Sequence, residues 1–388
     1  MSLALENHKK KLSVLFTNYG PYHIARINAS KSLFKKNWQV IGLEITRDGV
    51  DYQWKIKLDE AKFEIISILG DSKINQIGLT EQACSTFFTL NKLNPSVIVI
   101  AGYERPIMLL ALFWAIFRHR PRVMLSESKE DDQKRIWWKE KIKSLLIKKY
   151  SSALVGGNSH KKYLVKLGFP ENAIFTGYDV VDNRVFHPDV IRHLPNPLTE
   201  PFFLSINRFV KKKNLPLLIS AYASYIKKQS GNAWHLVLCG NGELRSELEE
   251  QISQHNLQKF VHLPGFLQQD ELLPYFAHAQ CFVHASTTEQ WGLVVNEAMA
   301  AGLPVLISNR CGCFEDLIIE GVNGFGFDPE NQDQLTKLML KISSGEVDLD
   351  LMGQASLEHI QKYSPDYFAQ GLQQAVEFAI NKKTDQQT

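Results

Sequence analysis

The sequence predicts an α/β protein built from two doubly wound domains, each with a parallel β-sheet covered by helices on both faces. Short apolar runs alternate with helix-length segments along most of the chain, as they do in proteins of this class. A polar stretch with four prolines, residues 186–201, interrupts the alternation once. The length of 388 residues also suits two domains better than one.

The first domain is predicted over residues 1–190. It opens with a strand at 11–17 and a turn signal at 18–21. A helix follows in which Ile24, Ile27 and Leu33 share one face. Further strands are predicted at 38–43, 96–100 and 122–126.

The proline-rich stretch has the composition of a linker, and the second domain is predicted over residues 200–364. Its strands are predicted at 202–207, 235–240, 260–263, 281–285 and 305–308, and its helices at 216–228, 244–255, 274–279 and 292–301. The same alternation as in the first domain therefore predicts a second parallel sheet.

The C-terminal segment, residues 365–382, is predicted to be a helix. Its apolar residues Phe368, Leu372, Ala375 and Ala379 fall on one stripe. Because an apolar stripe needs a surface to pack on, we expect this helix to lie back against the first domain.

The composition is that of a folded globular protein, with 44% hydrophobic and 22% charged residues. A formal net charge of +3 is small for this length and argues against a nucleic-acid partner. The five scattered cysteines lack the spacing of a metal site or a disulfide framework. The N-terminus lacks a signal-peptide pattern, and the longest apolar run, 107–117, is shorter than the roughly 20 residues that span a bilayer. We therefore expect a cytoplasmic protein.

The chemistry is concentrated in residues 285–304. A loop carrying Glu289 leads into a helix that Gly292 opens and Gly302 ends. Free N–H groups at a helix start bind anions, so the backbone of Gly292, Leu293 and Val294 is suited to a diphosphate. Gly292 has no side chain to keep that backbone away from a ligand.

Two carboxylates flank this helix start. Glu297 lies one turn into the helix and leans back toward the N-terminus, where it can accept hydrogen bonds from a ribose diol. Glu289 lies before the helix and can accept from hydroxyls on the other side of the phosphates. The arrangement suits a nucleotide sugar.

Residues 289–305 resemble the Glu-x7-Glu region of retaining glycosyltransferases with the GT-B fold, especially glycosyltransferase family 4. Glu289 is followed by Trp291 and a glycine, and Glu297 is followed by Ala-Met-Ala and then by Gly and Pro304. The resemblance implies two Rossmann-like domains that face each other across a cleft. The second would hold the nucleotide-sugar donor and the first the acceptor.

The resemblance continues across about residues 202–330. Arg208 and Lys213 match an Arg and a Lys that clamp the donor diphosphate, and Asn207 stands where the family usually has glycine. Alternatively, Lys213 is simply one of three consecutive lysines, 211–213, that are exposed to solvent. The donor-binding residues that the resemblance implies are Gly20, Asn207, Arg208, Lys213, Gly240, Asn241, Phe266, Glu289, Trp291, Gly292, Leu293, Val294 and Glu297.

The first domain matches less well. Many family members have a histidine within the segment 125–129 that touches the donor sugar, and this chain has none. Glu127 is a candidate replacement, and a structural hydrogen-bonding role for it stays open. We expect Tyr22, His23 and Ser126 on the acceptor side, while for His23 a structural role also stays open. Arg208, Lys213, Glu289 and Glu127 form the predicted catalytic set.

Residues 134–149 are basic and aromatic on a predicted helix, a composition typical of a membrane surface. The alternative, which we favour, is a helix packed by its tryptophans with a solvated lysine face. The first interpretation would give peripheral membrane contact through the first domain, at the inner face of the cell membrane.

The only Asp-x-Asp, Asp348 to Asp350, is interpreted as a solvated turn, so we expect no metal and no cofactor.

The resemblance implies a retaining glycosyltransferase that moves a sugar from a UDP- or GDP-sugar to a hydroxyl. The acceptor class stays open among glycans, lipid-linked molecules and small molecules. The alternatives are a GT-B enzyme that transfers nothing to an acceptor, such as a nucleotide-sugar epimerase, and an inactive nucleotide-sugar-binding protein.

Overall fold

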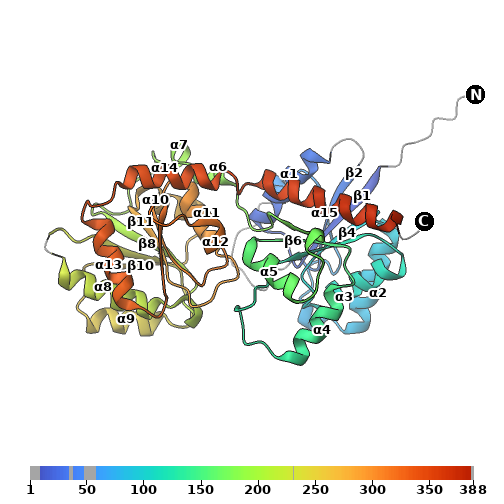
Figure 1. Ribbon diagram of the computed structural model, residues 1–388, viewed down its shortest axis with the longest axis horizontal. Coiled ribbons are helices and arrows are strands. Elements are labelled where there is room, and N and C mark those ends of the chain that lie inside the picture. The colour runs from blue at the N-terminus through green and yellow to red at the C-terminus, as the bar shows by residue number, and fades with distance from the viewer. Residues whose placement is uncertain (1–8, 35–37, 48–57, 230, 386–388) are drawn as a thin grey trace, which may run out of the picture. The chain divides into compact units, whose positions relative to one another are not determined.

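The computed structural model describes residues 9–34, 38–47, 58–229 and 231–385 (Figure 1). The chain falls into two compact units. Unit 1 comprises Met1–Ser128, Arg135–Val180 and Pro365–Thr388, and unit 2 comprises Lys129–Lys134 and Val181–Ser364. Each unit carries one sheet whose strands are all parallel, as the alternating pattern predicts.

Unit 1 has a seven-stranded sheet in the order β3-β2-β1-β4-β5-β6-β7. Its strands are β1 (Lys10–Phe16), β2 (Trp38–Glu44), β3 (Glu64–Ser67), β4 (Val97–Ala101), β5 (Arg122–Ser126), β6 (Ser152–Val155) and β7 (Ile174–Thr176). Its α-helices are α1 (Pro21–Leu33), α2 (Leu79–Leu93), α3 (Pro106–Phe117), α4 (Trp137–Ile147), α5 (Asn158–Lys166) and α15 (Pro365–Asp385), with short 3-10 helices at Leu58–Glu60, Ile74–Gln76 and Glu171–Ala173.

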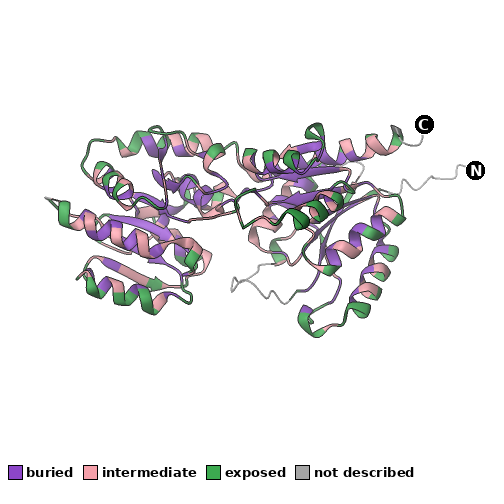
Figure 2. Cartoon of the chain, turned by 60° about the horizontal axis from the view of Figure 1, so that its bottom comes forward, coloured by how far each residue is buried: buried purple, intermediate pink, exposed green. Residues whose placement is uncertain are grey.

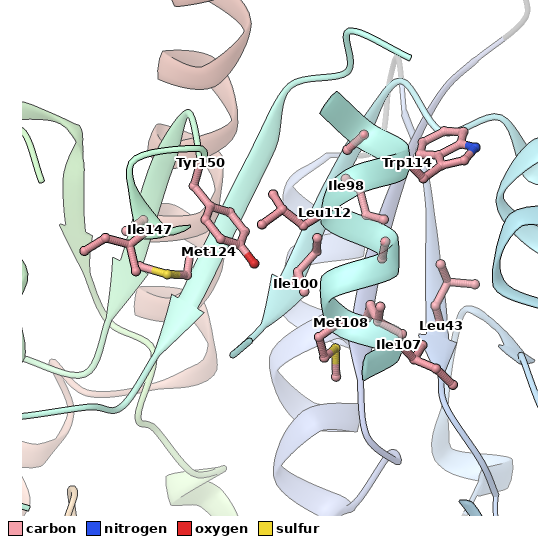
Figure 3. Packing of buried hydrophobic residues seen from close by; sticks show 14 of the residues in the cluster. Leu43, Ile98, Ile100, Ile107, Met108, Leu112, Trp114, Met124, Ile147 and Tyr150 are labelled. Atoms are coloured by element: carbon pink, nitrogen blue, oxygen red, sulfur yellow. The ribbon is translucent and has the colours of Figure 1, made fainter. Parts of the chain in front are cut away.

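The core of unit 1 lies between its sheet and the covering helices. The strands are largely buried on both faces, as parallel strands usually are, apart from the edge strands β3 and β7, which are partly exposed (Figure 2). The labelled side chains of this core are Leu43, Ile98, Ile100, Ile107, Met108, Leu112, Trp114, Met124, Ile147 and Tyr150 (Figure 3). The longest apolar run of the sequence therefore forms α3. One side of this helix packs in the core, whereas Phe113 and Phe117 are exposed.

The C-terminal helix α15 packs on α1 and on strands β5, β6 and β7 (Figure 1). The predicted stripe is the buried one, because Phe368, Leu372, Ala375 and Ala379 are all inaccessible to solvent. The side chain of Tyr367 adds a hydroxyl contact with Thr176 at 2.7 Å.

Unit 2 has a six-stranded sheet in the order β10-β9-β8-β11-β12-β13. Its strands are β8 (Phe202–Ile206), β9 (His235–Cys239), β10 (Val261–Gly265), β11 (Cys281–His284), β12 (Val305–Ser308) and β13 (Gly324–Phe327). Its helices are α6 (Asn183–Phe186), α7 (Pro188–Ile191), α8 (Leu215–Lys228), α9 (Arg245–Gln254), α10 (Gln269–His278), α11 (Leu293–Ala300), α12 (Phe314–Leu317), α13 (Gln332–Ser343) and α14 (Leu349–Ile360), with a 3-10 helix at Lys211–Lys213.

The unit boundary lies at Val181, earlier than the predicted end of the first domain at residue 190. The stretch predicted as a linker is also partly structured, because α6 and α7 pack on unit 2. Phe186 meets Phe276 edge to face at a centroid distance of 5.4 Å, and Ile191 is buried. The imidazole of His278 contacts the carbonyl oxygen of Leu194 at 2.7 Å. The proline-rich stretch therefore contains short helices that pack within unit 2, in addition to the chain that joins the two units.

Four strands were not predicted: β3, β6, β7 and β13. Each has only three or four residues, too few to show a period. In addition, two of the four residues of β13 are glycine, which is depleted in strands. Helix α10 also begins five residues before the predicted 274–279, with Pro274 inside it.

In each sheet the strand order reverses at one point, between β1 and β4 in unit 1 and between β8 and β11 in unit 2. Loops that follow the two strands at such a point leave in opposite directions and open a crevice at the carboxyl edge of the sheet. In unit 2 these are the loops that carry Arg208, Lys213 and Glu289.

The glycine turn after β9 packs against the backbone after β8. Gly240 has φ +135°, and a Cβ atom there would lie 1.8 Å from the carbonyl oxygen of Asn207. The N–H of Asn207 donates to the carbonyl of Cys239 (2.9 Å), and the N–H of Phe209 donates to that of Asn241 (2.8 Å). Glycine is therefore required here by the close approach of two protein loops.

Substitution of Gly240 by alanine should destabilise unit 2, because the new methyl group meets backbone rather than a movable side chain. We expect the free energy of unfolding to fall by about 2 kcal/mol or more in urea denaturation. Gly231→Ala is the matched control, since a Cβ there meets no atom within 4 Å. Equal effects of the two substitutions would contradict the packing role of Gly240.

Candidate functional site

The reversal point of the unit 2 sheet brings together loops that are 76 residues apart in sequence. The backbone N–H of Thr287, after β11, donates to the carbonyl of Lys212, after β8, at 2.9 Å. This link holds the lysine run beside the loop that carries Glu289. Arg208 lies at the start of the same loop after β8, with its side chain exposed.

Glu289 and Lys213 form an ion pair in which the Lys213 Nζ contacts Glu289 Oε2. Each side chain is only 12% exposed, so the pair is well shielded from water. Three further groups surround the carboxylate: the Lys212 Nζ at 3.9 Å, the His284 Nε2 at 3.4 Å and the Ser286 hydroxyl at 3.3 Å. The structure thus brings together two of the residues predicted to be catalytic.

The electrostatics of this cluster keep Glu289 ionised. Burial by itself raises the pKa of the carboxyl, but the hydrogen bond from His284 and the charge of Lys213 outweigh it. The net effect holds the pKa of Glu289 well below its ordinary value of 4.5. An ionised carboxylate accepts hydrogen bonds and donates none, so it suits hydroxyl groups of a ligand.

His284, which we did not predict, supports Glu289 from the end of β11. Its ring is fully buried, and burial followed by the charge of Lys213 lowers its pKa, so the imidazole is neutral at pH 7. Because the Glu289 carboxylate can only accept, the Nε2 atom carries the proton. The Nδ1 atom has no hydrogen-bond partner among the described residues. A histidine in an otherwise apolar strand, five residues before Glu289, was the available sequence signal.

The helix start predicted at Gly292 is present. Gly292 is the N-cap of α11 with φ 103°, a left-handed conformation that favours glycine, and the helix runs from Leu293 to Ala300. A Cβ on Gly292 would lie 3.4 Å from the Cγ of Glu289. The first N–H groups of a helix lack intrahelical partners, and Leu293 and Val294 are the first two residues of α11, so anion binding by their amides stays a prediction. Glu297 is buried one turn into the same helix.

The side chain of Trp291 is packed in the interior of unit 2. It is 2% exposed, and its indole N–H donates to the side chain of Asn296 at 2.8 Å. The backbone carbonyl of Trp291 accepts from the N–H of Cys313 at 3.2 Å. Trp291 therefore anchors the chain just before α11 to the interior of unit 2, a role that its position in the motif does not reveal.

Some residues of the loop after β8 and of the glycine turn after β9 are buried, and others are exposed. Asn207 is buried and donates to the Ser205 hydroxyl at 2.9 Å. Asn241 is exposed and its side chain accepts from the N–H of Gly242 at 2.9 Å. Phe266, just after β10, is 38% exposed and presents an aromatic face to solvent. Among these predicted residues, Arg208, Asn241 and Phe266 are accessible to a ligand.

A segment from the middle of the sequence also borders the Glu289 loop. Residues 129–134 belong to unit 2, and the buried Lys129 Nζ donates to the carbonyl of Arg310 at 2.7 Å and pairs with Asp131 at 2.8 Å. The Thr288 hydroxyl donates to the carbonyl of Asp131 at 3.4 Å. The loop containing Arg310 meets the Glu289 loop through the N–H of Gly312, which donates to the Glu289 carbonyl at 3.1 Å.

In unit 1, the loop after β1 holds two predicted residues together. The N–H of Gly20 donates to the Nδ1 of His23 at 3.1 Å, and the His23 ring stacks on Phe16 at 4.1 Å. Burial, followed by the charge of Arg26, lowers the pKa of His23 to about 3. His23 is therefore a neutral acceptor that shapes the loop. Tyr22 is half-buried beside it.

The residues after β5 meet a buried ionisable cluster. Glu127 is half-buried and hydrogen-bonded to Asp179. Burial, and next the adjacent Glu127 carboxyl, raise the pKa of Asp179 well above its ordinary range, although Arg26 at 4.0 Å opposes this. Asp179 is thus the protonated member of a carboxyl pair. Ser126 is buried, and its hydroxyl accepts from the N–H of Ser128 at 3.3 Å.

The remaining sequence features are readily placed. Asp348 caps helix α14, and Asp350 lies in its first turn. Within the described ranges, no group of three or more His, Cys, Asp or Glu side chains is arranged to hold a metal ion. All five cysteines are free, and only Cys84 is exposed. None of the helices in the described part of the chain has the length and apolar character needed to cross a membrane.

Residues 188–359 match the family model described as Glycosyl transferases group 1, which confirms the resemblance to glycosyltransferases. A curated relative is the amylovoran biosynthesis glycosyltransferase AmsK of Erwinia amylovora, 32% identical over 193 residues. The match covers 48% of this chain and 46% of that relative, so the chain spans less than half of its length.

Solved glycosyltransferase structures share the fold of both units. The chain is similar to a glycosyltransferase from Rickettsia africae, with a TM-score of 0.74 and 15% identity over 96% of this chain and 99% of that one. It is also similar to HepE of Anabaena, solved in complex with UDP and glucose, with a TM-score of 0.73 and 16% identity over 94% of this chain and 98% of that one. The GT-B fold is therefore confirmed.

Acid should weaken unit 2 through Glu289. A carboxyl whose pKa is lowered by folding stabilises the native state above its ordinary value of 4.5, and this contribution is lost as the pH falls below that value. We expect Glu289→Gln to show a smaller loss of melting temperature between pH 7 and pH 3 than the unaltered protein.

Glu249→Gln is the matched control for this comparison. It removes a carboxylate from an exposed ion pair with Arg245 on α9, and exposed pairs contribute little to stability. It should keep the pH dependence of the unaltered protein. If Glu289→Gln kept it as well, the ionised state of Glu289 would not be coupled to folding.

Proposed function

We propose that this chain is a glycosyltransferase that moves a sugar from a nucleotide-diphosphate sugar to an acceptor hydroxyl. The observation that carries the proposal is the ionised Glu289 beside Lys213 and the first turn of α11, at the reversal point of the unit 2 sheet. At one edge of the unit 2 sheet these groups offer a carboxylate that accepts hydrogen bonds from hydroxyls, a cation, and the free amides of a helix start. The match of residues 188–359 to the group 1 family supports the same activity.

Binding of a donor would change the contacts of the ion pair between Lys213 and Glu289. Lys213 and Glu289 satisfy each other, so neither is an isolated buried charge. On donor binding, the diphosphate attracts Lys213, and sugar hydroxyls take over as hydrogen-bond donors to Glu289. The ligand therefore exchanges one set of charge contacts for another, and His284 keeps the carboxylate in place during the exchange.

We assign the remaining donor contacts to other residues of unit 2. Arg208 is exposed at the end of β8 and offers a planar pair of donors to the diphosphate. The amides of Leu293 and Val294 bind the same group, and Glu297 accepts from the ribose. Phe266 provides an apolar face for the base. The UDP complex of HepE supports a uridine nucleotide, and a GDP-sugar is the other candidate donor.

We propose that the reaction retains the configuration of the anomeric carbon. The described residues of the site offer Glu289 as a hydrogen-bond acceptor held by two cations and a histidine, an arrangement that weakens it as a nucleophile. The acceptor hydroxyl would then attack from the same face as the departing nucleotide, whose diphosphate takes the proton. Arg208, Lys213 and the helix amides stabilise the charge that develops on that diphosphate.

A panel of UDP-, GDP- and ADP-sugars tests the activity itself. Incubation with each donor should release nucleoside diphosphate, slowly by hydrolysis and faster when a suitable acceptor is added. An epimerase would instead convert the nucleotide sugar without releasing nucleotide. Binding of a nucleotide sugar without any turnover of the panel would leave a binding protein and overturn the proposal.

Arg208→Ala should lower kcat/KM by about 100-fold or more, because the variant loses a charge contact to the leaving diphosphate. The initial rate of nucleotide release over a range of donor concentrations measures the effect. Lys211→Ala removes an exposed lysine of the same loop and should change the rate little. An unchanged rate for Arg208→Ala would remove Arg208 from the site.

A further inference from the structure

Helix α4 of unit 1 turns its large apolar side chains toward solvent. Trp137 is 77% exposed, Trp138 49%, Ile142 57% and Leu145 62%. Their successive spacings of one, four and three residues place them on one side of the helix, so they form a continuous outward face. This finding contradicts the interpretation we favoured from the sequence, a helix packed by its tryptophans.

Polar groups attach the opposite side of α4 to unit 1. Glu140 accepts a hydrogen bond from the Tyr163 hydroxyl at 2.5 Å and pairs with Arg135 at 3.7 Å. The Lys143 Nζ donates to the same hydroxyl at 3.0 Å, and the Ser144 hydroxyl donates to the carbonyl of Leu167 at 2.6 Å. Ile147 is the only fully buried residue of α4. The helix is thus held by these polar contacts and by Ile147 in the core of unit 1, which leaves the side with the tryptophans available.

The same segment concentrates positive charge. Residues 134–149 contain seven lysines and arginines and one acidic residue, whereas the whole chain has a net charge of only +3. Lys139 and Lys141 are exposed beside the tryptophans, and the Lys139 Nζ lies 5.5 Å from the centre of a Trp138 ring. Lys134, Lys148 and Lys149 are exposed at the two ends of the helix. The apolar face is therefore surrounded by cations.

We propose that α4 docks unit 1 on an anionic lipid surface. Tryptophan, leucine and isoleucine on one face of a lysine-rich helix enter the boundary between headgroups and acyl chains, while the lysines contact anionic headgroups. A second copy of the chain is disfavoured as the occupant, because its own lysines would meet like charges. A nucleic acid is disfavoured because its bases could stack on the two tryptophans but would leave the aliphatic side chains of Ile142 and Leu145 without an apolar partner.

The docking surface also bears on the acceptor. If unit 1 holds the acceptor, as we expect from the proposed function, then its attachment to lipid favours a lipid-linked acceptor over a soluble glycan or small molecule. This last step rests on the proposed function, whereas the binding of α4 to lipid does not.

Cosedimentation of the full chain with vesicles tests the docking. Vesicles of phosphatidylcholine alone are compared with vesicles that also contain phosphatidylglycerol, at an ionic strength of about 0.1 M and again at about 1 M, where screening is strong. We expect binding to the anionic vesicles at low salt, and weak binding to neutral vesicles or at high salt. Equal binding to both vesicles, or to neither, would overturn the proposal.

Two variants assign the binding to α4. The double substitution Trp137→Ser with Trp138→Ser should weaken the partition coefficient by about ten-fold or more, because it removes the apolar contacts. Lys139→Gln with Lys141→Gln should weaken it by about five-fold for each lysine, or about 25-fold together. Leu351→Ser is the matched control, since Leu351 is 65% exposed on α14 of unit 2.

Because the substituted side chains are exposed, the variants should keep the melting temperature of the unaltered protein and its release of nucleotide from a soluble donor. Trp137→Phe with Trp138→Phe should restore vesicle binding. If the serine variant abolished a dimer seen by sedimentation velocity while vesicle binding was unchanged, the face would be a protein interface and the proposal would fall. Vesicle binding without any nucleotide release would keep the docking and overturn only the proposed function.

Discussion

The ion pair between Lys213 and Glu289 is the interaction on which the site of unit 2 depends. It joins the loop after β8 to the loop after β11, and these loops are neighbours because the strand order reverses between those strands. A buried carboxylate without partners would take up a proton. Lys213, Lys212 and His284 together keep it ionised, so the site is held ready as a hydrogen-bond acceptor.

In unit 1 the buried carboxyl group of Asp179 is neutralised in a different way. Asp179 lies beside Glu127 and near Arg26, and its raised pKa keeps it protonated while it is hydrogen-bonded to Glu127. Both solutions avoid an uncompensated negative charge in the interior. In unit 2 the charge of Lys213 balances Glu289, which stays ionised and can accept hydrogen bonds. In unit 1 a proton neutralises Asp179, which is hydrogen-bonded to Glu127.

The motif residues were found from the sequence because local geometry determines them. Gly292 opens a helix after a loop, and Glu297 must lie one turn further on, wherever that helix is placed. The same pattern does not distinguish an inward side chain, such as that of Trp291, from one that faces a substrate, nor a glycine that approaches another loop, such as Gly240, from one that approaches a ligand. His284 was missed because its role comes from its distance to a residue on another element.

Periodicity and turn residues act within a few positions along the chain, so they were enough to predict the two parallel-sheet units, the helix start at Gly292 and the apolar stripe of α15. Which charges pair, and which face of α4 is buried, depends instead on contacts between elements that are distant in the sequence. The spacing of Trp137, Trp138 and the lysines fits a packed or an exposed face equally well. Polar contacts from Glu140, Lys143 and Ser144 turn the tryptophans outward, and those partners lie on or just beyond α5.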